Sequence, residues 1–119
     1  MRKRVLKPQL DADRLTEKRI QKGWSKIEAS EHMNIPQSVY SKYESGISKP
    51  SYSALRNVAL TLGTNIEYLT NRSDDDNPTE YLISNEDHDL FYIVDTYQKS
   101  TDKDKQRLIT YVQKLHDNN

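Results

Sequence analysis

Gly23 and Gly46 enclose the segment that most constrains how this chain can fold, GWSKIEASEHMNIPQSVYSKYESG. Within it, Ser25 is followed three residues later by Glu28, a capping-box pattern that predicts the start of a helix. The helix must be short, because the pattern is interrupted at Asn34. Its expected inward residues are Ala29 and Met33.

A second helix is expected after a break of only a few residues. Asn34 and Ile35 form the break, and Pro36 has a fixed φ that suits the first turn of a helix, where its missing N–H is not needed. The helix continues to about Ser45 and is ended by Gly46. The segment therefore predicts two short helices joined by a tight turn, within an all-α protein.

Another helix is expected before this pair. It begins after Asp11 or Asp13, because an acidic side chain can cap free amides and matches the positive end of the helix dipole. It ends at Gly23, and its expected anchors in the core are Leu15 and Ile20.

Two further helices are expected after the pair. Ser51 can cap the first of them, which ends at Gly63. Its apolar residues recur at spacings of three and four, at Leu55, Val58, Ala59 and Leu62. Thr64 or Asn65 begins the second, which is short. Its apolar residues are Ile66 and Leu69.

The chain has a net charge of zero but a marked polarity along its length. Residues 1–72 hold 13 Lys or Arg against 7 Asp or Glu, whereas residues 73–119 hold 5 against 11. Because phosphates attract the first part and repel the second, DNA is an expected partner of the first part. We divide the chain into a basic arm, a helical domain, an acidic linker and a C-terminal helical segment, at residues 1–10, 11–72, 73–83 and 84–119.

The arm carries four basic residues, Arg2, Lys3, Arg4 and Lys7. It could follow a groove or the backbone of DNA, as basic arms do in several DNA-binding proteins, or it could be an ordinary unstructured terminus. The residues alone leave both interpretations open.

The second helix of the central pair has two chemically different sides. At about 100° per residue, its polar arc holds Gln37, Ser38, Ser41, Lys42 and Ser45, and its opposite arc holds Val39, Tyr40 and Tyr43. In a major groove, short hydroxyls permit close approach, glutamine can bond adenine twice, and lysine can reach guanine or phosphate. Any surface helix has a polar face, but this one directly follows another helix and a tight turn. The combination favours a DNA-reading helix-turn-helix.

The segment from Arg14 to Leu69 resembles the lambda-repressor-like family of helix-turn-helix domains, which includes the Cro/repressor and Xre types. The resemblance is carried by KRIQKGWS at 18–25, KYESG at 42–46 and LGTNIEYL at 62–69. It implies a five-helix DNA-binding domain in a sequence-specific transcriptional regulator. A repressor of phage or mobile-element origin that binds a pseudo-palindromic operator as a dimer is the expected case.

The resemblance also implies residues that contact double-stranded DNA. Those expected to line the major groove are Gln37, Ser38, Ser41 and Lys42. Ser25 and Lys26, at the start of the preceding helix, would hold the sugar–phosphate backbone. Lys26 departs from the family pattern, where glutamine is usual, so any base contact at this position is in doubt. Pro36 also departs from the pattern, because a small polar residue is common there.

Of the remaining positions, some are expected to contact DNA and others to stabilise the domain. Lys49 is expected beside phosphate, and Val39 could contact either a thymine methyl or the core. Tyr40 and Tyr43 lie where the family keeps apolar core side chains, so we expect them in the core. Two residues that match an internal ion pair of similar repressors are expected to be structural, namely Arg19 and Glu44.

The C-terminal segment predicts two amphipathic helices. Ser84 and Asp87 form a capping-box signature before the first, and Thr101 precedes the second. A hairpin of two such helices cannot bury both apolar faces well by itself. We therefore expect it to pair with a second copy through its apolar residues: Leu90, Ile93, Val94, Tyr97, Leu108, Val112 and Leu115.

A function of a different class is an antitoxin-type protein-interaction module. In that case the C-terminal hairpin would bind a heterologous protein, such as a toxin or an antirepressor, and DNA binding would be secondary. The two hypotheses differ in what the hairpin contacts.

Neither a catalytic nor a metal-binding pattern is expected. His32, His88 and His116 lie in separate elements, and the chain has no cysteine. We therefore expect neither enzymatic activity nor a cofactor. The lack of cysteine suits a cytoplasmic protein. The apolar stretch from Phe91 to Val94 is far shorter than the ~20 residues that cross a bilayer, so a membrane partner is not expected.

Overall fold

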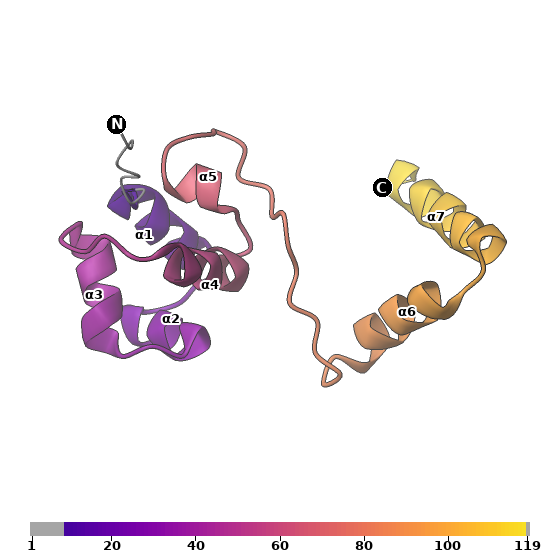
Figure 1. Ribbon diagram of the computed structural model, residues 1–119, viewed down its shortest axis with the longest axis horizontal. Helices are drawn as coiled ribbons and strands as arrows, with labels where there is room; N and C mark the ends of the chain where they lie inside the picture. Colours follow the sequence, from indigo (N-terminus) through magenta and orange to yellow (C-terminus); the bar gives the residue numbers. More distant parts are fainter. Residues whose placement is uncertain (1–8, 119) are drawn as a thin grey trace, which may run out of the picture. The chain divides into compact units, whose positions relative to one another are not determined.

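The computed structural model describes residues 9–118, and over these residues it is all-helical, which confirms the predicted fold class (Figure 1). The helices are α1 (Ala12–Gln21), α2 (Lys26–Met33), α3 (Gln37–Ser45), α4 (Tyr52–Leu62), α5 (Ile66–Leu69), α6 (His88–Lys99) and α7 (Asp102–Asp117). The chain divides into two units, Met1–Tyr81 and Leu82–Asn119. Each unit is described by itself.

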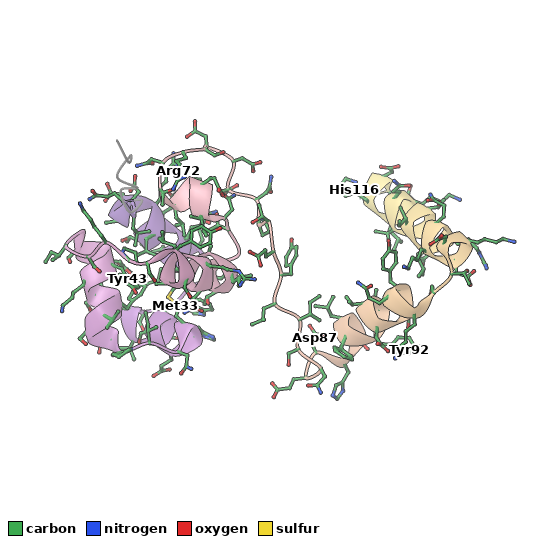
Figure 2. The ribbon with its side chains drawn as sticks, in the orientation of Figure 1. Met33, Tyr43, Arg72, Asp87, Tyr92 and His116 are labelled. Atoms are coloured by element: carbon green, nitrogen blue, oxygen red, sulfur yellow. The ribbon has the colours of Figure 1, made fainter. Side chains whose placement is uncertain are left out.

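Helices α1 to α5 pack around the small core of the first unit. Its buried apolar members are Leu10, Leu15, Ala29, Met33, Tyr40, Tyr43, Leu55, Val58, Ala59, Leu62, Ile66 and Leu69. Figure 2 shows Met33 and Tyr43 inside this unit. Because α3 lies against both α1 and α2, its orientation is determined from two sides.

Side chains cap the helices much as the sequence predicts. Asp11 accepts hydrogen bonds from the N–H groups of Asp13 and Arg14 and so begins α1. The capping box of α2 is complete, since Glu28 N–H donates to Ser25 Oγ at 3.1 Å and Ser25 N–H donates to Glu28 Oε1 at 3.1 Å. The side chains of Ser51, Asn65 and Thr101 each accept one backbone hydrogen bond and so cap α4, α5 and α7.

Three local expectations are wrong. Ile20 is 61% exposed rather than an anchor of α1, because five residues after Leu15 place it about 140° around the helix from the buried side. Pro36 lies at the N-cap of α3, one residue before the first turn, with a ψ of 144°. In the second unit α6 is capped by Asp87 itself, and Ser84 Oγ accepts a hydrogen bond from Glu86 N–H instead.

Part of the segment expected as an acidic linker lies against the first unit. We call residues 73–80 the acidic strap. Its backbone is held by side chains at the start of α5, because Asn65 Nδ2 donates to the carbonyls of Asp75 and Asn77 at 2.8 and 2.6 Å. Thr64 Oγ1 also donates to the carbonyl of Asp76 at 2.9 Å.

The second unit consists of α6, α7 and the residues around them. Over 82–118 every residue keeps appreciable solvent exposure, and none is buried. A groove of about 300 Å³ between the two helices is lined by Ile93, Val94, Tyr97, Leu108, Ile109, Val112 and Gln113. Across residues 9–118, helices long and apolar enough to span a membrane are absent.

Candidate nucleic-acid interface

Helix α3 separates its polar from its apolar side chains as the wheel predicts. Gln37, Ser38 and Lys42 are exposed, and Ser41 is half-buried. On the opposite side Tyr40 and Tyr43 are buried, with ring centroids 6.5 Å apart in an edge-to-face arrangement. Val39 is half-buried against the core cluster, so part of its surface remains accessible. The helix thus presents short polar side chains and one lysine to solvent while its tyrosines hold it in place.

An ion pair joins the end of α3 to α1. Arg19 Nε donates to Glu44 Oε2 at 2.7 Å, and Arg19 Nη2 donates to Glu44 Oε1 at 3.2 Å. The side chains of Arg19 and Glu44 are only 15% and 4% exposed. Thr16 Oγ1 donates to Glu44 Oε1 at 2.9 Å, and Arg19 Nη1 donates to the carbonyl of Trp24 at 2.9 Å. The network therefore links α1, the junction before α2 and the last turn of α3.

Burial and these contacts change the pKa values of the groups involved. Burial by itself raises the pKa of Glu44, but the hydrogen bonds donated by Arg19 and Thr16 outweigh it and hold that pKa below its ordinary value. Burial, reinforced by the neighbouring carboxylate, raises the pKa of Tyr40 well above its ordinary value. The buried Tyr40 hydroxyl has no hydrogen-bond partner among the described residues.

The turn before α3 is held by backbone geometry and by α4. Asn34 adopts a left-handed conformation, with φ of 57°, and ends α2. The N–H of Ile35 then donates to the carbonyl of Ser30 at 3.0 Å. Asn57 Nδ2, on α4, donates to the carbonyl of Met33 at 2.8 Å. Because both sides of the turn are tied down, the start of α3 has a defined position relative to α2.

The residues expected on the DNA backbone are exposed. Ser25 and Lys26 lie at the start of α2, and Lys49 lies in the loop between α3 and α4. Pro36 supplies no side-chain hydrogen bond to the first turn of α3. The exposed side chains of Ser25, Lys26 and Lys49 are therefore accessible to phosphate. Arg2, Lys3, Arg4 and Lys7 lie outside the described residues.

Sequence reasoning missed two residues that support this interface. Thr16 lies three positions before Arg19 on the same face of α1, and this spacing was the available signal for its bond to Glu44. Asn57 had no local signal, because its partner carbonyl lies 24 positions earlier in the chain.

Trp24 and His32 pack against each other. Trp24 is partly buried, and its ring stacks on that of His32 with centroids 4.0 Å apart. Over the part of the chain that the structure describes, His, Cys, Asp and Glu side chains form no group of three or more that could hold a metal ion.

Comparison with known proteins connects this geometry to a family. Residues 15–69 match the family described as helix-turn-helix. Over 63 residues the chain is 38% identical to the HTH-type transcriptional regulator AnsR of Bacillus subtilis (strain 168). The match covers 53% of this chain and 54% of that protein, so the chain spans about half the length of this relative. No solved structure matches the chain.

Proposed function

We propose that this chain, whose residues 15–69 are a helix-turn-helix domain of the lambda-repressor-like family, is a sequence-specific DNA-binding transcriptional regulator. The observation that carries the proposal is the two-sided α3. Its exposed Gln37, Ser38 and Lys42 are held outward by two buried tyrosines and by the ion pair between Arg19 and Glu44. A rigid helix with small polar side chains at its start is what base reading in a major groove requires.

The proposed contacts divide into base reading and backbone positioning. Gln37 and Ser38 read base edges near the start of α3, and Ser41 and Lys42 extend the contact along the groove. Val39 contributes its exposed surface to a thymine methyl. Three residues contact the sugar–phosphate backbone and set the register, and these are Ser25, Lys26 and Lys49.

The second unit supports a dimer. It holds ten exposed large apolar side chains and no buried residue over 82–118, so two helices alone leave their shared apolar face in water. Two copies that pair through the groove residues, together with Leu90 and Leu115 three positions along α6 and α7 from Ile93 and Val112, would form a four-helix bundle. We propose that this pairing gives a two-fold symmetric protein, which occupies a pseudo-palindromic operator.

The regulatory consequence of such binding is repression. A dimer that inserts α3 of each copy into successive major grooves on one face of DNA occupies the duplex and blocks polymerase. An origin in a phage or mobile element and a place in the cytoplasm belong to the same proposal. The relative that the chain matches is named as a transcriptional regulator, which is consistent with this role.

The test is selection of bound duplexes from a random pool by the purified full chain, at a stated salt concentration. We expect an enriched motif with two-fold symmetry and half-sites about one helical turn apart. Failure to enrich any motif would overturn the proposal. Enrichment only when another protein is bound to the C-terminal hairpin would favour the antitoxin-type alternative.

A further inference from the structure

The described cations of the first unit, over residues 9–81, fall into two groups. Arg14, Lys18, Arg19 and Arg56 each form an ion pair with a carboxylate. By contrast, Lys22, Lys26, Lys42, Lys49 and Arg72 form no ion pair with any described residue. The second group contains all three lysines that we place on DNA.

The acidic strap supplies the carboxylates for most of the first group. Asp74 Oδ1 lies 2.7 Å from Arg14 Nη2, and Asp76 pairs with Lys18. Glu80 accepts from Arg56 through two nitrogens, with Nη2 at 2.6 Å from Oε2 and Nε at 3.1 Å from both carboxylate oxygens. Thus one segment of eight residues neutralises cations on both α1 and α4.

The strap and the helix-turn-helix lie at different places on the first unit. In Figure 1 the loop after α5 runs along the top of this unit, whereas α2 and the start of α3 lie at the bottom. The direction of the strap is set by the hydrogen bonds of Thr64 and Asn65, so its carboxylates are held beside their partners. The paired cations Arg14, Lys18 and Arg56 belong to α1 and α4, outside the two helices of the helix-turn-helix.

Exposed ion pairs of this kind add little to folding stability, because their charges stay hydrated. Asp74 is almost fully exposed, and Arg56 and Glu80 are each about half exposed. Their effect on DNA is larger, since each lysine or arginine that reaches a phosphate releases condensed counterions, and a carboxylate beside it opposes that contact. Lys18 is nearly buried, and Arg14 is only 22% exposed and also donates to the carbonyls of Tyr68 and Ser73. The pairs of these two cations with Asp76 and Asp74 therefore mainly anchor the strap.

We propose that the acidic strap is a specificity element, which masks Arg56 from phosphates and so confines DNA contact to the α2 and α3 face. The inference rests on the proposed DNA-binding function. It assigns Glu80 a role in discrimination, because a regulator finds its operator only when binding to all other DNA is weak. Loss of the mask should raise non-specific affinity and leave the reading contacts intact.

The experiment uses the full chain and two duplexes in parallel, the one selected above and one of unrelated sequence, over a range of salt concentrations. Glu80→Gln keeps the shape of the side chain and frees Arg56. We expect non-specific affinity to rise several-fold, up to about eight-fold at 0.1 M salt for one added phosphate contact, with the salt slope steeper by about 0.9. Circular dichroism of each variant shows that the fold is kept.

Two controls separate masking from bulk charge. The double variant R56Q/E80Q has the wild-type net charge and should return non-specific affinity to the wild-type value. Asp75→Asn removes the same charge as Glu80→Gln at a residue whose carboxylate accepts only the N–H of Asn77, and it should leave the salt slope unchanged. The inference is overturned if E80Q and D75N behave alike, or if the double variant stays elevated. Because the selected duplex is measured in parallel, loss of all DNA binding would instead contradict the proposed function.

Discussion

Gln37 and Lys49 are both exposed, yet a DNA contact from each would depend on different properties of the duplex. A glutamine amide bonds the edge of one base, so its contribution changes with sequence. A lysine on phosphate contributes the same attraction on every duplex and loses it as salt rises. The two residues therefore allow the reading and positioning roles to be separated experimentally.

We predict that Gln37→Ala relaxes base preference at one position of each half-site, with a loss of discrimination of about 1–3 kcal/mol there. Lys49→Ala serves as its counterpart and should weaken all duplexes alike, with a salt slope shallower by about 1. Competition binding against single-base variants of the selected duplex measures both effects. Equal losses on every sequence for Gln37→Ala would remove it from the reading residues.

The Glu44 carboxylate makes the first unit sensitive to acid. Its pKa in the folded chain lies below the ordinary value of 4.5, so the stability that it contributes is present above that value and is lost as pH falls through the lowered folded pKa. We predict that the free energy of unfolding declines below about pH 4.5 more steeply in the wild type than in Glu44→Gln. Urea denaturation between pH 7 and 3 measures it, and parallel curves would contradict the prediction.

At the scale of elements, the helix ends were predictable because their signals are local. The caps at Asp11, Ser25 and Ser51 use a side chain and an amide only a few residues apart, so the sequence pattern contains the whole interaction. The buried face of α1 was harder to predict, because Lys18 rather than Ile20 lies on its covered side. Lys18 is covered because it contacts the Tyr68 ring and pairs with Asp76, and both residues come from distant parts of the chain.

The end of α3 gives a test at this scale. Gly46 has φ of 77°, and a Cβ added there would meet nothing within 4 Å, so a substitution acts only through backbone conformation. We predict that Gly46→Ala lowers the free energy of unfolding by about 1–2 kcal/mol, because L-residues disfavour the left-handed region. Gly46→Asn should cost less, since asparagine tolerates that region. Thermal or urea denaturation compares them, and equal costs would show that contacts of the loop decide instead.

At the scale of the whole molecule, the sequence predicts the five-helix domain and the amphipathic hairpin but does not reveal the strap. Composition marked residues 73–83 as an acidic linker, because acids and breakers are typical of linkers. The contacts of Asp74, Asp76 and Glu80 with α1 and α4 join positions 24 to 60 residues apart. Such pairings require the folded arrangement of the helices, which local patterns do not contain.

The hairpin gives the last prediction, which concerns assembly. Val112 lines the apolar groove and is 57% exposed in the single chain, so a buried glutamate at this position in a dimer would lack a partner. We predict that Val112→Glu converts a dimer at micromolar concentration into a monomer, as measured by sedimentation. Tyr92→Glu is the matched control, because Tyr92 is 72% exposed and lies outside that groove (Figure 2).

The same pair of variants connects assembly to DNA binding. If two copies bind one operator, the first bound α3 holds the second α3 close to its half-site, so the second contact is effectively intramolecular. Loss of the dimer should therefore weaken operator binding by about a hundred-fold or more. Val112→Glu should therefore lose operator affinity while a single half-site is bound as weakly as by the wild type. Tyr92→Glu should keep both the dimer and the operator affinity. A wild-type chain that sediments as a monomer at micromolar concentration, or a Val112→Glu monomer with full operator affinity, would contradict the proposed dimer.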